Sequence, residues 1–377
     1  MAVHFATGET DMEHRQLPRL ALALCAATCV APLAARAADF YAGKTLALMI
    51  NYAPGGPADT EGRIVARHLG KHIPGNPAIV IRSMPGAGGV IGANWLGTVA
   101  PPDGSTLGFL TGVTSKGAMA DPNFKADMSK YAFIASASGI TITFARTDIA
   151  PGLKKPEDIL KAKDFWVGGL TADSDKDLRE RMELEMLGVP HKYISGDGNT
   201  ADARIALERN EIQYYAESSP SYRAFVEPGL VETGRAIALW SNSIDTPNGL
   251  ARSPDADGID APTFEEFLIK TKGAPPKGIL YESYRRISAT GTTFLRFYAM
   301  APGTPKEATD AIRGGLVAME KDPDFRDDAI RVMKVVPTLG VGEATEKAFR
   351  ERLTANPEFI AFMRDYIAKG HAISGKK

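Results

Sequence analysis

The sequence predicts an α/β protein with two domains, and three observations support this prediction. Short apolar runs that end in Gly- and Pro-rich turns alternate with segments whose apolar residues recur at helical spacing, a pattern typical of doubly wound sheets. The alternation occurs in two blocks, which begin near residues 44 and 165. The chain has 377 residues, more than one ordinary core accommodates, and its 37 glycines and 25 prolines supply many turns.

The first block contains a strand–helix–strand–helix–strand unit. Strand-like apolar runs lie over 44–52, 78–84 and 106–111. The cluster Ala53–Pro57 ends the first run, and Asp59 or Thr60 can then cap a helix that reaches about residue 72. A glycine-rich turn opens the second helix, which runs to about residue 99. This order of elements is that of a parallel sheet with crossover helices.

The second block and the C-terminal part continue the alternation. Further strands are predicted over 131–137, 140–145, 165–169, 191–194, 212–216 and 236–240. Helices are predicted over 156–162, 173–187 and 200–209. A long apolar stretch follows, and then four helices, over 292–300, 305–321, 324–333, 343–353 and 357–369.

The composition excludes several classes of protein. Hydrophobic residues make up 44% and charged residues 24%, as in an ordinary globular protein, so a disordered, collagen-like or multi-span membrane chain is excluded. Lys and Arg number 44 against 45 Asp and Glu. The resulting net charge of −1 gives no basic field for a phosphate backbone, so we expect no nucleic-acid partner.

The first 37 residues read as a cleavable secretory signal peptide. A basic start that includes Arg19 precedes the apolar run 20–34, and Ala35–Ala37 is an A-x-A cleavage site. The run is too short for a membrane span, which needs about 20 apolar residues. Met12 is our candidate for the true initiator. Both cysteines, Cys25 and Cys29, lie inside the signal without the small residues that precede a lipid-modified cysteine, so the mature chain should contain no thiol.

No motif in the chain predicts catalysis, a metal or a cofactor. The turn Gly86–Gly92 resembles a dinucleotide fingerprint, but Ile91 stands where its third glycine belongs. His68 and His72 have zinc-compatible spacing, but Leu69 replaces the catalytic glutamate, and we expect a solvated pair. The text around Ser115 does not fit the nucleophile motif G-x-S-x-G. An exported hydrolase nevertheless stays open as an alternative function.

Two strand–turn–helix junctions, one in each block, are the features best suited to binding. We name residues 52–59 the first jaw and residues 168–174 the second jaw. Such junctions present unpaired helix N–H groups and the positive end of the helix dipole, which suit carboxylates and other anions. In open α/β sheets ligands bind beyond the carboxyl ends of the strands, where both turns are expected. Taken singly, each junction could also be only a capped helix start.

Several motifs together resemble the solute-binding proteins of tripartite tricarboxylate transporters, often called the Bug family. The matching segments are Phe40–Thr45, then the first jaw, then 83–94 (SMPGAGGVIGAN) and 100–107 (APPDGSTL). Residues 261–266 (APTFEE) and 301–305 (APGTP) match later segments of the family. The resemblance therefore covers nearly the whole mature chain, in order.

The resemblance implies a two-lobed periplasmic binding protein of type II, a venus flytrap with mixed sheets and a ligand in the cleft between the lobes. It also implies the ligand-binding residues. In the first lobe these are Tyr52, Ala53, Pro54, Gly55, Gly56, Asp59, Met84, Gly86, Gly88 and Thr111. In the second lobe they are Gly169, Leu170, Thr171, Ala172, Asp173, Ser174 and Glu217.

The second jaw departs from the family pattern, which is rich in Gly, Ser and Thr. This chain has Asp173, Asp175 and Asp177 there. An acid at this place repels an anion and competes for the same N–H groups. A dicarboxylate, a monocarboxylate, an aromatic acid and a ligand with a cationic group all stay open. An Asp173→Ser variant should then bind simple dicarboxylates better.

The function implied is capture of a small organic acid by hinge closure and delivery to membrane transporter subunits from the periplasm, by a monomer without a cofactor. A ligand sensor for a membrane signalling partner is a second alternative. Hinges are expected near 144–150 and 279–290. The expected division is a signal peptide over 1–37, the first part of lobe 1 over 38–145, lobe 2 over 146–280, and the completion of lobe 1 with the C-terminal helices over 281–377.

Overall fold

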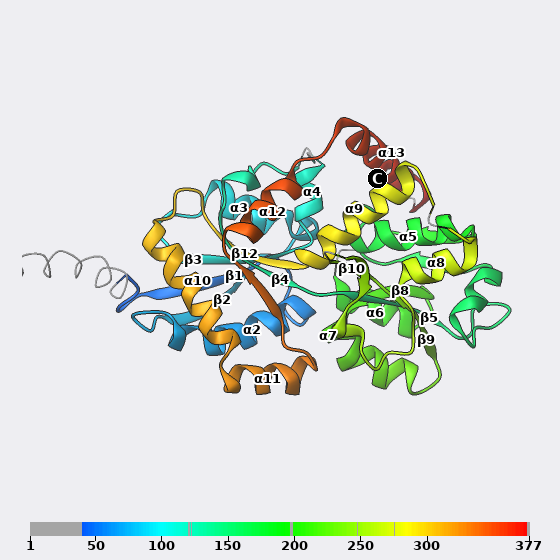
Figure 1. Cartoon of the computed structure of the whole chain (residues 1–377), viewed down its shortest axis with the longest axis horizontal. Coiled ribbons are helices and arrows are strands. Elements are labelled where there is room, and N and C mark those ends of the chain that lie inside the picture. The colour runs from blue at the N-terminus through cyan, green and yellow to red at the C-terminus, as the bar shows by residue number, and fades with distance from the viewer. Residues whose placement is uncertain are drawn as a thin grey trace, which may run out of the picture.

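The computed structural model describes residues 40–374, except 120, 122, 197, 198, 247 and 275. The predicted signal peptide, with Met12 and both cysteines, lies outside the described residues. Two lobes lie side by side, and each contains its own β-sheet (Figure 1). No helix among the described residues is long and apolar enough to cross a membrane.

The first lobe is built on a six-stranded mixed sheet with the order β13-β4-β12-β3-β1-β2. Strands β1, β2 and β3 are parallel, as the alternating pattern of the first block predicts. Strand β12 lies antiparallel between β3 and β4, and β13 pairs antiparallel with β4. The strand bounds are β1 Thr45–Ile50, β2 Ala78–Ser83, β3 Thr106–Thr111, β4 Ala132–Ser138, β12 Arg296–Met300 and β13 Thr338–Val341.

Helices cover both faces of the first sheet because successive strand residues point to opposite sides. In β1, Leu48 and Ile50 pack with α2, α10 and α11, whereas Met49 packs with α3 and α12. The helix bounds are α2 Pro57–Leu69, α3 Val90–Thr98, α4 Thr114–Ala118, α10 Lys306–Glu320, α11 Pro323–Met333 and α12 Glu343–Leu353. Short 3-10 turns are η1 Gly70–His72, η2 Ala87–Gly89 and η3 Met128–Lys130.

The second lobe has a five-stranded mixed sheet with the order β7-β6-β8-β5-β9. The strand bounds are β5 Thr141–Arg146, β6 Trp166–Gly168, β7 Lys192–Ile194, β8 Tyr214–Ser218 and β9 Ala236–Ser241. Helices α5, α8, α9 and α13 pack in the hydrophobic cluster on one face of the sheet. Helix α6 and the π-helix η5 (Tyr222–Val231) pack in the cluster on the other face. The helix bounds are α5 Asp175–Leu187, α6 Thr200–Glu208, α7 Ser219–Ser221, α8 Phe264–Lys272, α9 Ile279–Thr293 and α13 Pro357–Ser374, with η4 Pro156–Lys161 and η6 Pro254–Ala256 as 3-10 turns.

The chain passes between the lobes at positions that differ from the expected hinges. Strand β4 of the first sheet ends at Ser138 and β5 of the second begins at Thr141, so the first crossing is at 139–140 rather than 144–150. Helix α9 packs in the second lobe through Tyr284 and Ile287 and also contacts α4 and β4 of the first lobe. Strand β12 of the first sheet begins at Arg296, so the next crossing is at the end of α9, at about 294–295. Gly139 N donates to Thr292 O at 2.9 Å and ties the two crossings together.

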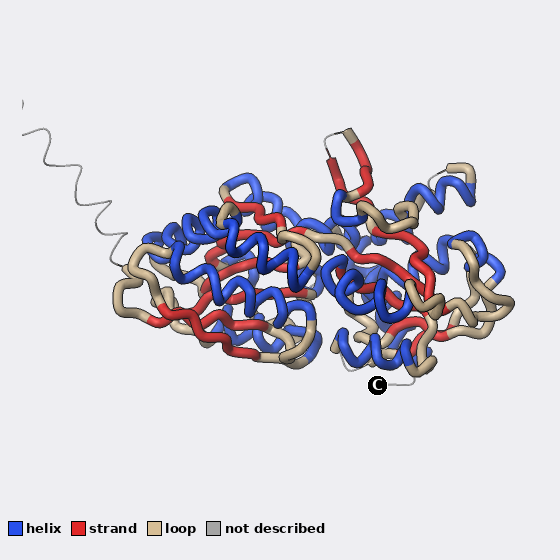
Figure 2. Tube along the Cα trace, turned by 90° about the horizontal axis from the view of Figure 1, so that it is seen from below, coloured by secondary structure: helices blue, strands red, loops and turns tan. Residues whose placement is uncertain are grey.

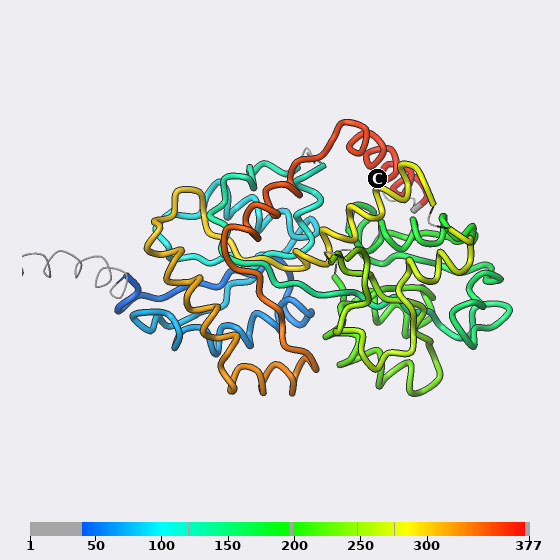
Figure 3. The backbone as a smooth tube through the Cα atoms, in the orientation of Figure 1, coloured from blue at the N-terminus to red at the C-terminus, as the bar shows by residue number. Residues whose placement is uncertain are grey.

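A third crossing, over 354–356, carries the C-terminal helix onto the second lobe. Helix α13 lies above that lobe in Figure 1, and Figure 3 shows the chain passing to it from α12. Its residues Phe359 and Met363 pack in the same cluster as α5 and α8. The predicted domain boundaries stay a prediction, but the last helix packs with the second lobe.

Several elements had no counterpart among the predicted ones, including α4, α9 and β13. The hairpin β10 (Ser243–Thr246) and β11 (Gly249–Arg252) projects from the second lobe, as Figure 2 shows. The π-helix η5 (Tyr222–Val231) contains Pro228, which sequence reasoning reads as a helix breaker. Helix α8 begins with a capping box at Thr263 and Glu266, which is a local signal of a helix start.

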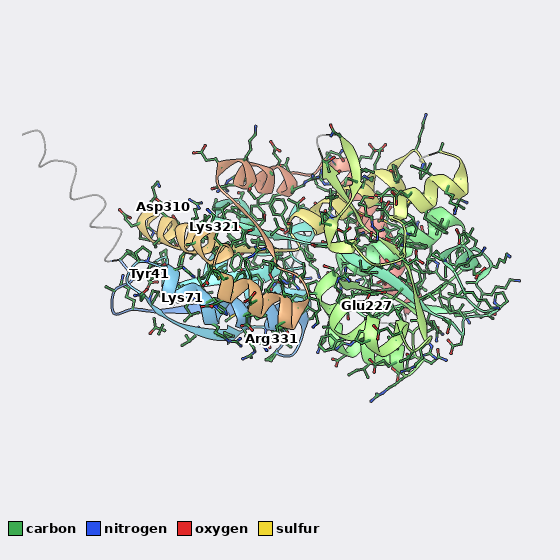
Figure 4. All side chains as sticks on the ribbon, turned by 60° about the horizontal axis from the view of Figure 1, so that its bottom comes forward. Tyr41, Lys71, Glu227, Asp310, Lys321 and Arg331 are labelled. Carbon is green, nitrogen blue, oxygen red and sulfur yellow. The ribbon has the colours of Figure 1, made fainter. Side chains whose placement is uncertain are left out.

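The histidine pair is not solvated. His68 Nε2 lies 3.1 Å from Asp328 Oδ2, and His72 Nε2 lies 2.8 Å from Asp322 Oδ2. Both aspartates belong to α11 or its N-cap, which pack on α2 only in the tertiary structure. Figure 4 labels Lys71 and Arg331, which extend this network of ion pairs between the two helices. No group of metal-ligating side chains occurs in the described part of the chain.

Candidate functional site

A cavity lies between the two lobes, where the ends of strands from both sheets meet. It contains about 840 Å³ of space not filled by protein atoms, part of it open solvent. Backbone turns, hydroxyls and three basic side chains form its walls. The lining residues are Tyr52, Ala53, Gly56, Pro57, Ala58, Thr111, Gly112, Thr114, Thr141, Leu170, Ser174, Asp175, Lys176, Arg179, Asn199, Thr200, Ser218, Gly291, Phe294, Leu295 and Arg296.

The first jaw presents the N-terminus of α2 to the cavity. Its N-cap, Gly56, has no side chain to accept a hydrogen bond from the first N–H groups of the helix. Asp59 is turned back instead, because its Oδ2 accepts from Gly55 N at 2.9 Å and from Arg63 Nε at 2.8 Å. The helix start is thus held in shape while its first N–H groups remain suited to an anion.

Asn51 directly precedes the first jaw and holds it to the neighbouring strand. Its Nδ2 donates to Thr111 O at 2.9 Å and its Oδ1 accepts from Thr111 N at 3.0 Å, so the ends of β1 and β3 are joined. Thr111 Oγ1 in turn donates to Leu295 O at 2.7 Å. The predicted residue Thr111 therefore connects the first jaw to the second crossing between the lobes.

The second jaw differs from the first because its helix starts are capped from within. Ser174 is the N-cap of α5, and its Oγ accepts from Asp177 N at 3.2 Å. Asn199 caps α6 through Oδ1, which accepts from Ala201 N at 3.0 Å. The helix-terminus argument therefore applies more directly to the first jaw than to the second.

Buried cations supply the positive charge of the cavity. Arg179 and Arg296 line it and are only 4% and 5% exposed. Arg296 Nη1 pairs with Glu61 Oε2 at 2.9 Å, while its Nε has no hydrogen-bond partner among the described residues. Arg179 donates through Nη1 to Asn242 and through Nε to Asp175 O. An unpartnered buried donor is costly, so a ligand oxygen at Arg296 would be favoured.

Burial shifts the titration of the charged groups around the cavity. It lowers the pKa of Lys176, although the charge of Glu217, whose Oε2 lies 3.7 Å from Nζ, opposes this shift. Burial also raises the pKa of Asp175, against the hydrogen bond of Ser115 and the charge of Arg179. Burial raises the pKa of Glu61, and the charge of Arg296 opposes it.

Six of the predicted ligand-binding residues line the cavity. They are Tyr52, Ala53, Gly56, Thr111, Leu170 and Ser174. The other eleven are not among the lining residues. These are Pro54, Gly55, Asp59, Met84, Gly86, Gly88, Gly169, Thr171, Ala172, Asp173 and Glu217. Glu217 is fully buried and contacts Lys176 and Arg204, so it positions the cation that lines the cavity.

Sequence reasoning missed the basic residues of the cavity. Arg179 lies inside a helix whose many charges look like a solvated surface, and nothing local marks it as buried. Arg296 could have been recognised from the sequence, because it interrupts the apolar stretch 292–300. A charged residue in a buried strand is costly unless it has a partner.

Asp173 is paired with a cation of the first lobe. Sequence reasoning treated it as an unpaired acid, but its Oδ2 lies 2.6 Å from Lys116 Nζ of the first lobe. Burial alone would raise the pKa of Asp173, but the charge and the hydrogen bond of Lys116 lower it below the usual value. Asp177 does not face the cavity either; it is buried and accepts from Tyr193 Oη at 2.8 Å.

Comparison of the sequence with known proteins identifies a partial relative. No protein-family model matches the chain. The UPF0065 protein in the TAR-I ttuE-ttuC' intergenic region of Agrobacterium vitis is 34% identical over 86 residues, which are 23% of this chain and 24% of that protein. The chain thus matches about a quarter of the length of this curated relative.

Comparison of the structure with solved proteins covers nearly the whole described chain. The periplasmic binding protein BugD has 19% identity and a TM-score of 0.58, with 89% of this chain and 99% of BugD covered. MatC from Rhodopseudomonas palustris, solved with malate, has 17% identity, coverage of 88% and 99%, and a TM-score of 0.57. A further R. palustris protein, solved with adipate, has 17% identity, coverage of 88% and 97%, and a TM-score of 0.60.

These comparisons confirm the predicted α/β fold with two mixed sheets. They also confirm the resemblance drawn from the motifs, because a TctC solute-binding protein from Polaromonas is a further neighbour, with 22% identity and a TM-score of 0.56. The chain therefore has the type II periplasmic binding-protein fold, and the periplasmic binding protein BugD and a TctC solute-binding protein are among its structural neighbours.

Proposed function

We propose that this chain is an exported solute-binding protein that captures a small organic acid between its lobes and delivers it to a membrane transporter. Closure of the lobes at the crossings 139–140 and 294–295 would enclose the ligand. The protein would act in the periplasm as a monomer and return its ligand unchanged. The malate and adipate found in two structural neighbours make carboxylates the first class to test.

The observation that carries the proposal is the pair of buried arginines in the wall of the cavity. A guanidinium that is kept almost out of water gains strongly from a carboxylate partner, because charge-assisted hydrogen bonds are stronger in a low-dielectric site. The uncapped start of α2 adds N–H donors on the side of the first lobe, to which Arg296 also belongs, whereas Arg179 belongs to the second lobe. An acid with one carboxylate at each lobe would satisfy both sets of donors.

The test compares two variants of one helix. Arg179 and Arg181 both lie in α5 and are both buried, but only Arg179 lines the cavity. Arg181 lies instead between the rings of Tyr193 and Tyr366, at 4.7 and 4.5 Å from their centroids. An Arg179→Gln variant should bind acids roughly 10- to 100-fold more weakly, whereas Arg181→Gln should lose stability with its affinity retained.

The assay is a thermal-shift screen followed by calorimetry. The panel contains malate, adipate, succinate and benzoate, each with its neutral amide as control. An acid at about 100-fold excess over its Kd should stabilise the fold by about 2.7 kcal/mol. Equal loss of affinity in both variants, or binding of amides as well as acids, would contradict the proposal. Conversion of a bound acid into product would instead favour the hydrolase alternative.

A further inference from the structure

An ion pair joins the two lobes beside the cavity. Lys116 belongs to α4 of the first lobe, and its Nζ lies 2.6 Å from Oδ2 of Asp173 in the second jaw. The Lys116 side chain is 2% exposed and the Asp173 side chain 24% exposed. The two residues are 57 positions apart. Lys116 follows β3 of the first sheet, whereas Asp173 follows β6 of the second sheet. The contact therefore depends on how closely the lobes approach.

The surroundings of Lys116 are shaped to receive it. A Cβ atom added at Gly88 would lie 2.7 Å from Lys116 Nζ and 3.6 Å from Thr171 Oγ1, so this glycine leaves room where both lobes meet the ammonium group. Tyr52 donates to Gly88 O at 3.3 Å. Burial raises the pKa of Tyr52, and the charges of Asp175 and Asp173 raise it further across the cleft.

The second jaw without Lys116 is a poor site for an anion. Asp175 is the first residue of α5 and lines the cavity, and Asp173 stands just before Ser174, the N-cap of this helix. Their repulsion of an anion is strong where water is excluded. Lys116 contributes opposite charge to both acids, since it lowers the pKa of Asp173 and opposes the rise in the pKa of Asp175.

We infer that Lys116 and Asp173 form an ion pair of the closed cleft that couples lobe closure to acceptance of an anion. When the lobes separate, Lys116 moves away and the second jaw regains its acidic charge. When they close, Lys116 cancels this charge and holds the jaws together. Asp173 thus favours binding rather than opposing it, contrary to the expectation for Asp173→Ser. The part concerning the anion rests on the proposed function, whereas the part concerning closure does not.

The first measurement follows closure without ligand. The expected mature chain contains no cysteine, since Cys25 and Cys29 lie in the predicted signal peptide. Cysteines introduced at Lys347 of the first lobe and Asp164 of the second, whose side chains are 80% and 83% exposed, can be labelled for energy transfer. Lys116→Gln and Asp173→Asn should each shift the ligand-free protein toward the open form, and the double variant should open no further than either.

The second measurement is the affinity for adipate and malate in a double-mutant cycle. Lys116→Gln leaves both acids without their counter-charge and should weaken binding about tenfold or more. Adding Asp173→Asn should restore at least about fivefold of this loss, since contacting charges commonly couple by roughly 2- to 150-fold. The control is the pair Lys130–Asp127, at 3.4 Å within the first lobe, whose cycle should be additive.

The outcomes separate the two proposals. Unchanged energy transfer in both single variants would overturn the closure pair, whatever the ligand. An additive affinity cycle would overturn the coupling to the anion. If no acid binds to the protein but both variants open it, the proposed ligand class fails and the closure pair stands.

Discussion

The charge of Glu183 should lower the stability of the protein as the pH rises. This residue lies in α5 and is buried in the second lobe, with 1% of its surface exposed. Its Oε2 accepts from Tyr214 Oη at 2.9 Å and from Trp240 Nε1 at 3.0 Å. Burial raises its pKa from 4.5 to about 7, although these hydrogen bonds oppose the rise. The native protein therefore keeps a proton that the unfolded chain has lost between these two pH values.

The sign and the size follow from proton linkage. Because the native state binds more protons in this range, the free energy of unfolding falls as the pH rises from about 4.5 to about 7 and then levels off. A shift of this size corresponds to about 3 kcal/mol, at roughly 1.4 kcal/mol for each pH unit. A Glu183→Gln variant keeps an oxygen for the two hydrogen bonds and carries no charge, so it should lack this loss.

The assay is urea unfolding followed by circular dichroism at pH 5 and at pH 8. Between these conditions the wild type should lose about 2–3 kcal/mol more than Glu183→Gln. Glu282 is an exposed carboxylate in the first turn of α9, and Glu282→Gln should retain the pH dependence of the wild type. If the wild type and Glu183→Gln show the same change with pH, then Glu183 is not a protonated buried acid and the reasoning is refuted.

Two further predictions concern stability away from the cavity. Thr263→Ala removes the capping box of α8, in which Thr263 Oγ1 accepts from Glu266 N at 3.2 Å, and should lower the unfolding free energy by about 1 kcal/mol in urea titrations. No loss would show that the cap contributes nothing. Phe109→Ala removes a buried ring stacked on Tyr298 at a centroid distance of 4.7 Å. This substitution should lower the unfolding free energy by about 3–5 kcal/mol. A loss under about 1 kcal/mol would mean that neighbouring side chains of the first lobe fill the space left by the ring.

Local signals explain most of what sequence reasoning predicted correctly. The turn at Pro54–Gly56 and the presence of a helix after it follow from residues that are neighbours in the chain. The predicted cap was wrong, because α2 begins at Pro57 with Gly56 as its N-cap, so Asp59 and Thr60 lie inside the helix rather than at its cap. Strand β3 spans the predicted residues 106–111. Elements with mixed signals were missed, such as η5 with Pro228 and the hairpin β10–β11.

The cavity shows the limit of such reasoning. Tyr52, Gly56 and Ser174 could be placed there because they stand at strand–turn–helix junctions. Arg179 could not, because a charged residue in a helix is normally solvated. Only tertiary contacts bury it, among them those with Asn242 and with Gly291 of α9.

The sequence by itself determined the alternation of strands, turns and helices in two blocks, and its resemblance to a known family implied the two lobes and the cleft between them. The alternation depends on backbone preferences and on the spacing of apolar residues, both of which are local. Only the tertiary structure decided which charges are buried and with what they pair. Lys116 meets Asp173, and Arg296 meets Glu61, only because distant segments come together away from water. The strength and even the sign of a charge's effect depend on this proximity and desolvation, which no local pattern records.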